Sequence, residues 1–212
     1  MDMLLALASG IGTTIFVTVF SFVLGAFLAL PLTWARVSGI APLKVLATAI
    51  VEVFRGVPII VWLLLMYLSV VIGPWRPDPL TTSVVVFSFL SAVYLSEIYR
   101  SSLMAIPRGQ WEAAHALALP QMVGFARIIV PQAIPLVIPA AATFAIGLLK
   151  DAAIGSIIGT KDVTFYAQEW AKVNGGPITV FAAAAAIYLV LSIPIAIVAR
   201  RSGDALRKRV MG

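Results

Sequence analysis

Long runs of hydrophobic residues, rather than an alternation of hydrophobic and polar positions, dominate this chain. Each of the longest runs meets or approaches the roughly 20 apolar residues that a helix needs to cross a bilayer. A β-barrel is disfavoured because its strands would show alternation. The pattern predicts an all-α membrane protein, one transmembrane domain over residues 1–212, with about five transmembrane helices near residues 10–34, 43–72, 80–99, 131–149 and 178–199.

The composition also indicates that the chain lies in a lipid bilayer. The 212 residues are 61% hydrophobic and 11% charged, whereas about a quarter of the residues of a soluble domain are charged. The net charge of +6 lies mostly between the apolar runs, which indicates membrane topology and no nucleic-acid partner. The first apolar run continues from Leu4 past Leu30, too long for a cleavable signal peptide, so it is expected to remain as a spanning helix.

The distribution of basic residues predicts the orientation. Alternate loops of a five-span protein lie on the same side, and Lys and Arg concentrate on the cytoplasmic side. The other side has Arg76, Lys150, Lys161 and Lys172, with several acidic residues. We therefore expect the N-terminus outside and the C-terminal tail in the cytoplasm, with these residues on the cytoplasmic side: Arg36, Lys44, Arg100, Arg108, Arg127, Arg200, Arg201, Arg207, Lys208 and Arg209.

Prolines recur along the fourth apolar run. Pro131, Pro135 and Pro139 are spaced four residues apart, so one helix face loses several N–H donors and the helix is expected to bend. The spacing alone favours a pore-lining or gating helix and a simple packing kink equally.

The stretch over residues 101–130 is too polar to span a membrane. Pro107 and Gly109 are expected to interrupt the incoming helix, residues 110–117 favour a short helix, and Pro120 is expected to end it. This helix presents the carboxylate of Glu112 beside small residues, which would let a partner surface approach closely. The pattern predicts a docking element at the cytoplasmic face of the membrane.

The same stretch resembles the EAA loop of bacterial ABC importer permeases, whose pattern is EAA, three residues, Gly, nine residues, Ile, one residue and Leu-Pro. Ala118 replaces the usual Gly and Val130 the usual Leu, and the alanine suggests that the usual need for a positive φ or a close contact is relaxed here. The resemblance implies a type I ABC importer permease fold with a coupling helix that binds an ATPase. The coupling residues that it implies are Arg108, Gly109, Glu112, Ala113, Ala114, Ala118, Ile128 and Pro131.

Further segments narrow the resemblance to permeases for histidine, glutamine, arginine, glutamate and similar solutes. Residues 52–61 are similar to the E-x-F-R-G-T-P-L-x-V stretch of that group, with Val57 in place of Thr. Residues 94–103 resemble its A-Y-x-x-E-x-x-R run, with Val93 in place of the Ala. Residues 148–153 resemble its L-L-K-D-T/S-S segment, with alanines at the hydroxyl positions. Loss of these hydroxyl groups suggests a different substrate preference.

Ionisable residues at membrane depth need an explanation because they are costly there. Glu52 and Arg55 are three residues apart, so we expect mainly that they neutralise each other, with direct substrate contact as the alternative. Glu97 and Arg100 have the same spacing and are expected to support the docking loop. The candidates for the translocation path are Glu52, Arg55, Tyr94, Glu97, Lys150 and Asp151.

The chain contains no phosphate-binding loop of the G-x-x-x-x-G-K-[ST] type, so we expect a non-catalytic subunit without a cofactor of its own. A single histidine, His115, and the absence of cysteine argue against a metal site. The resemblance implies a second permease subunit, identical or paralogous, two ATP-binding subunits that carry ATP and Mg, and an extracytoplasmic solute-binding protein. Candidate contacts for that binding protein are Tyr166, Gln168 and Glu169.

The predicted function is ATP-driven import of a polar amino acid across the bacterial cytoplasmic membrane by alternating access. An ectoine-like compatible solute or an opine is the nearest alternative substrate. A secondary transporter or channel is a more distant alternative, weakened because no internal repeat or filter-like run is apparent. A non-transporting scaffold subunit is the third, and the ionisable residues at membrane depth argue mildly against it.

Overall fold

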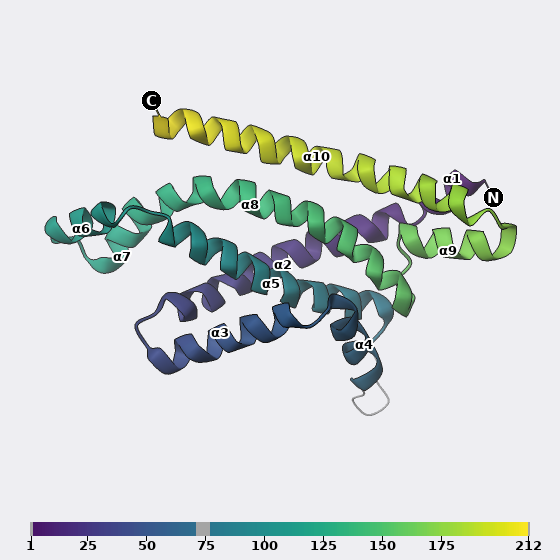
Figure 1. Cartoon of the computed structure of the whole chain (residues 1–212), viewed down its shortest axis with the longest axis horizontal. Helices are drawn as coiled ribbons and strands as arrows, with labels where there is room; N and C mark the ends of the chain where they lie inside the picture. Colours follow the sequence, from purple (N-terminus) through teal and green to yellow (C-terminus); the bar gives the residue numbers. More distant parts are fainter. Residues whose placement is uncertain (1, 71–76, 212) are drawn as a thin grey trace.

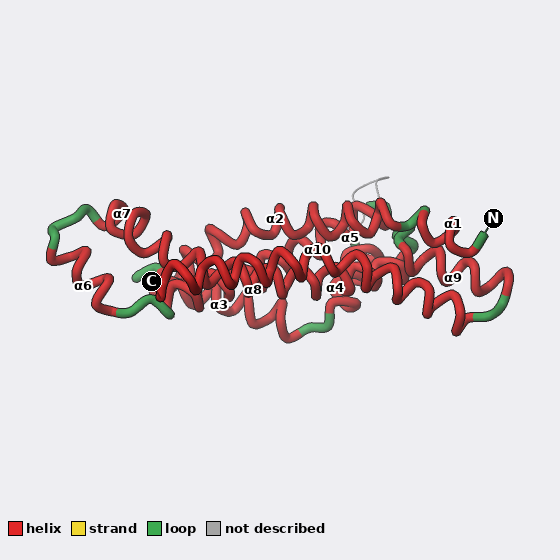
Figure 2. Tube along the Cα trace, turned by 90° about the horizontal axis from the view of Figure 1, so that it is seen from above, coloured by secondary structure: helices red, strands yellow, loops and turns green. Residues whose placement is uncertain are grey.

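The computed structural model describes residues 2–70 and 77–211, with side chains up to residue 202. Arg76 and the end of the predicted second span therefore lie outside the described residues, as do the side chains of Arg207, Lys208 and Arg209. Helices joined by short connections make up the described part (Figure 2). In chain order they are α1 (Met3–Ala8), α2 (Ile11–Val37), α3 (Ala41–Gly56), α4 (Ile59–Ser69), α5 (Pro79–Met104), α6 (Arg108–Ala116), α7 (Gln121–Gly124), the π-helix η1 (Phe125–Ile129), α8 (Val130–Asp151), the 3₁₀ helix η2 (Ala152–Ile158), α9 (Val163–Asn174) and α10 (Pro177–Met211).

The pair α2 and α5 forms the centre of the fold, where the two long helices pack along each other. Small residues line the contact, as is common where membrane helices approach closely. A Cβ atom added at Gly25 would lie 2.2 Å from the Cβ of Ser91. The Ser21 hydroxyl donates to the carbonyl of Val84 across the same contact, at 3.2 Å. Only a residue without a side chain therefore fits at this crossing.

The predicted second span is broken into α3 and α4, which meet at 98°. Val57 is extended between them, with φ −103° and ψ 131°, and Pro58 caps α4. Proline has no N–H to continue a helix and disfavours the helical conformation in the preceding residue. The Gly56-Val57-Pro58 sequence thus explains the sharp turn, and the bend places Arg55 at an exposed helix end.

Helices α8 and α10 pack against each other on one side of the central pair. The arch of α8 is visible in Figure 1, and Pro135 and Pro139 lie within the helix. This curvature follows the expected effect of prolines that remove backbone donors. α10 is 35 residues long and contains Pro194.

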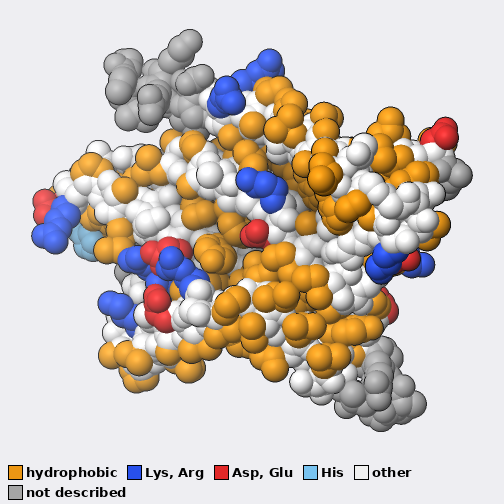
Figure 3. Space-filling view, turned by 45° about the vertical axis from the view of Figure 1, so that its right-hand side comes forward, with side chains coloured by type: hydrophobic (Ala, Val, Ile, Leu, Met, Phe, Trp, Pro, Cys, Tyr) orange, Lys and Arg blue, Asp and Glu red, His pale blue; other side chains and the backbone are white. Residues whose placement is uncertain are grey.

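Four helical stretches in the described part are long and apolar enough to cross a membrane, or five if the bent pair α3 and α4 counts as one. Each predicted range overlaps one of them. Figure 1 places α6, the α2–α3 connection and the C-terminus at one end, and the N-terminus and α9 at the other. On the face shown in Figure 3, hydrophobic side chains are spread over the surface, and charged ones lie mainly at its edges with a few near its centre.

Candidate coupling site and translocation path

The predicted docking element is the helix α6. Pro107 is its N-cap, so α6 begins at Arg108 and Gly109 lies inside it. The expectation that Gly109 interrupts the incoming helix was wrong, because Pro107 alone accounts for the break. Glu112 and Ala113 are exposed, whereas Ala114 is buried, and its Cβ would lie 3.2 Å from a Cβ added at Gly124. α6 thus presents the Glu112 carboxylate outward and packs its small residue against the next segment.

Ala118 adopts a positive φ of 51°, the one non-glycine residue to do so in the described part. Two hydrogen bonds close the end of α6 here, from the N–H of Ala118 to the carbonyl of His115 and from that of Leu119 to the carbonyl of Ala114. The expectation that this position no longer needs a positive φ was therefore wrong. The turn keeps its left-handed geometry and the alanine is strained in it.

Replacing Ala118 with glycine is expected to stabilise this turn by about 0.5–1 kcal/mol, because the left-handed region costs a Cβ-bearing residue about 1–2 kcal/mol and glycine loses part of that gain in chain entropy. Hydrogen exchange of the α6 amide groups measures the local change. As a control, Ala116→Gly changes the last residue of α6, which has helical geometry, and should destabilise the helix by about 0.5 kcal/mol. Faster exchange in Ala118→Gly would contradict the strain argument.

The other predicted coupling residues lie where α6 meets the base of α8. Ile129 is buried with Ile106 and Ala133, and half-buried Ile128 packs against this cluster. Pro131 occupies the first turn of α8, where its missing N–H is tolerated. The Nδ1 atom of His115 lies 2.7 Å from the carbonyl oxygen of Trp111, a contact within one turn of α6. Ala113, Ala114 and Ala118 complete the set on one short segment.

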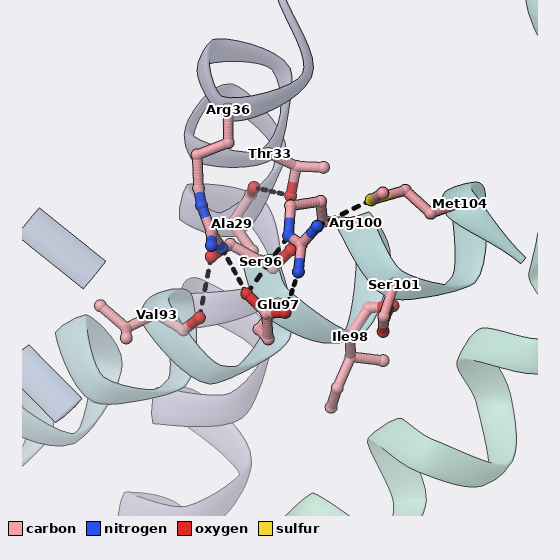
Figure 4. Close-up of polar contacts among 10 residues, drawn as sticks. All are labelled: Ala29, Thr33, Arg36, Val93, Ser96, Glu97, Ile98, Arg100, Ser101 and Met104. Atoms are coloured by element: carbon pink, nitrogen blue, oxygen red, sulfur yellow. Dashed lines mark hydrogen bonds and ion pairs between the residues drawn. The ribbon is translucent and has the colours of Figure 1, made fainter. Parts of the chain in front are cut away.

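Glu97 forms ion pairs with two arginines, and the spacing along the sequence predicted only the one with Arg100. The expected ion pair with Arg100 is present, and Arg36 of α2 approaches a carboxylate oxygen of Glu97 to 2.7 Å (Figure 4). The Arg36 side chain is only 5% exposed. One turn before Arg36 in α2, the Thr33 hydroxyl donates a hydrogen bond to the carbonyl of Ser96 in α5. This cluster joins α2 to α5 just before the predicted coupling segment begins.

Arg55 pairs with an aromatic ring rather than with Glu52, so the expectation of a mutually neutralised pair was wrong. The guanidinium lies 5.8 Å from the centroid of the Tyr94 ring on α5, which is cation–π geometry. No ion pair joins Glu52 to Arg55 in the described residues, and both side chains are exposed. The i, i+3 spacing permits an ion pair but does not require one, and here the tertiary contact with Tyr94 prevails.

Aromatic residues surround this point. Phe54 stacks on Trp62 at 4.4 Å, and Phe144 of α8 stacks on Tyr94 at 5.4 Å. Arg55 thus lies beside an aromatic wall contributed by α3, α4, α5 and α8. Lys150 and Asp151 lie elsewhere, in the last turn of α8, and no hydrogen bond or ion pair described for the chain links them to Arg55.

Asp162 is a buried carboxyl that the sequence did not single out. It is 1% exposed, caps α9 by accepting from the N–H of Phe165 at 2.7 Å, and also accepts from the hydroxyl of Tyr188 at 3.3 Å. A Cβ added at Gly10 would lie 2.3 Å from the Asp162 backbone. Asp162 therefore marks a tight junction of α2, α9 and α10 at the end of the molecule that holds the N-terminus.

Burial raises the pKa of Asp162 to about 6, from an ordinary value of 3.8. Because the pKa is raised in the folded protein, the neutral Asp162 carboxyl stabilises the fold relative to the ionised form. This contribution to the free energy of unfolding is complete below about pH 4 and is lost as the pH rises to about 6. Asp162→Asn keeps an acceptor for Phe165 and carries no charge, so it should be about 3 kcal/mol more stable than the wild type at pH 7. Thermal unfolding of both proteins from pH 4 to 7 tests this, and a constant difference across that range would contradict it.

Comparison with known proteins agrees with this geometry. Residues 21–211 match the family described as binding-protein-dependent transport system inner membrane component. The chain is 33% identical over 193 residues to the L-cystine transport system permease protein TcyB of Bacillus subtilis, covering 91% of this chain and 82% of that protein. It is 32% identical over 195 residues to the glutamate/aspartate import permease protein GltK of Escherichia coli O157:H7, covering 88% and 87% respectively.

Solved structures give the same fold. One, described as an amino acid ABC transporter with histidines, superposes with a TM-score of 0.88 at 30% identity and covers 94% of each chain. An inward-facing MetNI methionine ABC transporter has a TM-score of 0.84 at 23% identity, with coverage of 97% and 99%, which supports the fold alone.

The chain therefore belongs to the family of inner membrane permease components of binding-protein-dependent transport systems. It has the all-helical type I ABC importer permease fold and is a multi-pass, non-catalytic membrane subunit of an importer. The ATPase of such a system is a separate chain.

Proposed function

We propose that this chain forms the pore of an ATP-driven importer for a polar amino acid or an amino-acid-like solute. The observation that carries the proposal is the pair of exposed, oppositely charged side chains Glu52 and Arg55, which do not neutralise each other in the described contacts. A free amino acid carries a carboxylate and an ammonium group, so these two side chains have the charges that complement it. Charged residues at membrane depth generally mark a substrate pathway.

The relatives support this substrate class. They include permeases named for cystine, for glutamate and aspartate, and for octopine, the last from Rhizobium radiobacter with 32% identity over 200 residues. These solutes share a zwitterionic amino-acid group. The aromatic wall with Tyr94 would shield the charged contacts from water and strengthen them. Glu97, Lys150 and Asp151 remain candidates for the remainder of the path.

The proposed assembly contains a second permease subunit, identical or paralogous, two ATP-binding subunits and an extracytoplasmic solute-binding protein. Residues 1–212 act as one permease domain, with the N-terminus outside and the C-terminal tail in the cytoplasm. The ATP-binding subunits hold ATP and Mg and dock on α6, where the exposed Glu112 supports this role. ATP-driven closure of these subunits then moves α6 and switches the pore between outward and inward openings.

Reconstitution with the ATP-binding subunits and the binding protein in liposomes tests this function. Wild-type complex should take up labelled polar amino acids with ATP hydrolysis. Glu112→Lys reverses the proposed docking charge, so the chain should insert in the membrane yet fail to co-purify with the ATPase. Arg55→Met should keep the ATPase but lose uptake about tenfold or more, because a charge-assisted contact contributes about 1.5–3 kcal/mol.

Lys44→Met is the matched control, since it removes a positive charge from an exposed position in the same helix, α3. Its uptake should equal that of the wild type. Absence of ATPase binding to the wild type would instead favour a channel or a scaffold subunit. Uptake of ectoine in preference to all polar amino acids would replace the substrate while retaining the importer. Preference for an opine would narrow the amino-acid-like class to that solute.

A further inference from the structure

A hydrogen bond between two glutamine side chains joins α6 to α8. The Nε2 group of Gln132 donates to Oε1 of Gln110 at 3.1 Å and to the carbonyl oxygen of Ile128 at 2.8 Å. Gln110 lies on α6 two residues before Glu112, and Gln132 lies in the first turn of α8. The bond therefore connects the helix that carries the proposed docking carboxylate directly to the base of a membrane-spanning helix.

The other contacts around α6 are mainly apolar, so the hydrogen bond between Gln110 and Gln132 is the contact with a defined geometry between α6 and α8. α6 packs against α7 and η1, which lead into α8. The rings of Trp111 and Phe125 lie 6.3 Å apart between α6 and η1. On another side, a groove of about 940 Å³ lies between α6 and the end of α2, with Trp34, Trp111 and His115 among its lining residues. Apolar contacts of this kind can slide, whereas a hydrogen bond fixes the register of the two helices.

The base of α8 is also a place where a side-chain donor matters. Residues 125–129 form a π-helix, a wide turn that is often found at functional sites. Pro131 follows and supplies no backbone N–H. The Gln132 amide donates both to the carbonyl of Ile128 in the π-helix and to Gln110 in α6. One side chain thus links this irregular turn to α6.

We propose that Gln110 and Gln132 are positioning residues that transmit the displacement of α6 to α8, so that ATP hydrolysis and opening of the pore remain coupled. The inference rests on the proposed function, in which α6 is the ATPase-docking helix. Breaking the bond should leave the ATPase attached, because Glu112 and its neighbours are unchanged. It should lower the number of solute molecules moved for each ATP hydrolysed.

The test uses the reconstituted complex and compares wild type with Gln110→Met, Gln132→Met and Gln110→Glu. Methionine has a similar length but lacks the amide, whereas Gln110→Glu keeps an oxygen acceptor for the Gln132 amide. Both methionine variants should co-purify with the ATPase and lose about fivefold in solute moved per ATP, the lower range of coupling between two sites. Gln110→Glu should retain the wild-type ratio. The double methionine variant should be no worse than the poorer single variant, because both remove the same bond.

A purely structural role would lower the thermal stability of the variants without changing that ratio. The inference is overturned if the ratio is unchanged in Gln110→Met, which is exposed and should fold normally, or if Gln110→Glu loses as much as Gln110→Met. A wild-type chain that binds no ATPase overturns the proposed function and this inference together. If the wild type moves solute with ATP hydrolysis and the methionine variants move the same number of solute molecules per ATP, this inference alone is overturned.

Discussion

Glu97→Gln is expected to destabilise the protein by about 3 kcal/mol, because it leaves the buried guanidinium of Arg36 without its carboxylate. The substitution preserves the size of the side chain but removes the charge that offsets both Arg36 and Arg100. Two neighbouring guanidinium groups would then repel each other where α2 meets α5. Thermal unfolding in detergent, followed by tryptophan fluorescence, measures the change in stability.

Glu169→Gln is the matched control for this prediction. Glu169 pairs with Lys172 at the same i, i+3 spacing, but both side chains are largely exposed. An exposed pair of this kind contributes about 0.5 kcal/mol or less. Removing the Arg36 charge in the Glu97→Gln protein, by Arg36→Met, should recover part of the lost stability. Equal unfolding midpoints for Glu97→Gln and Glu169→Gln would show that burial of Arg36 adds nothing.

Two pairs of oppositely charged residues, Glu97 with Arg100 and Glu52 with Arg55, illustrate what the sequence could predict and what it could not. The spacing of Glu97 and Arg100 correctly predicted their pair, since residues three apart lie on one helix face. The same reasoning failed for Glu52 and Arg55, because Tyr94, distant in sequence, takes the guanidinium. Local spacing defines which pairs are possible, and the tertiary structure decides which of them form.

The helices themselves were largely predictable. A helix must satisfy its backbone hydrogen bonds internally in lipid, so a long apolar run leaves few alternatives. Pro58 explains the break between α3 and α4 within the predicted second span, although the angle of 98° depends on packing. The second arginine at Glu97 was not predictable, because Arg36 lies on another helix and its spacing along the chain carries no signal.

Ala118 shows a different limit. An alanine at the glycine position of the EAA pattern suggested a relaxed turn, yet the backbone remains left-handed with φ 51°. The hydrogen bonds that end α6 impose this geometry whatever side chain is present. Residue identity therefore indicates the cost of a conformation, whereas the surrounding contacts determine the conformation itself.

The crossing of α2 and α5 was also absent from the sequence-based predictions, and it leads to the second large effect. Gly25→Ala is expected to destabilise the protein by about 3 kcal/mol, the upper range for forcing extra atoms into a packed core. The added Cβ would lie 2.2 Å from the Cβ of Ser91 and 2.9 Å from the backbone N of Ala92. Backbone atoms cannot rotate away, so the two helices must separate. Thermal unfolding measures the loss.

Gly12→Ala provides the control, because Gly12 also lies in α2 but a Cβ there would meet nothing within 4 Å. It should unfold within about 0.5 kcal/mol of the wild type, as an ordinary surface substitution does. Ser91→Gly in the Gly25→Ala protein removes the closest opposing atom and should restore part of the stability. The backbone of Ala92 remains in place, so recovery should be incomplete. If Gly25→Ala unfolds like Gly12→Ala, the helices can separate at little cost, and the close α2–α5 contact is not what holds the centre of the fold together.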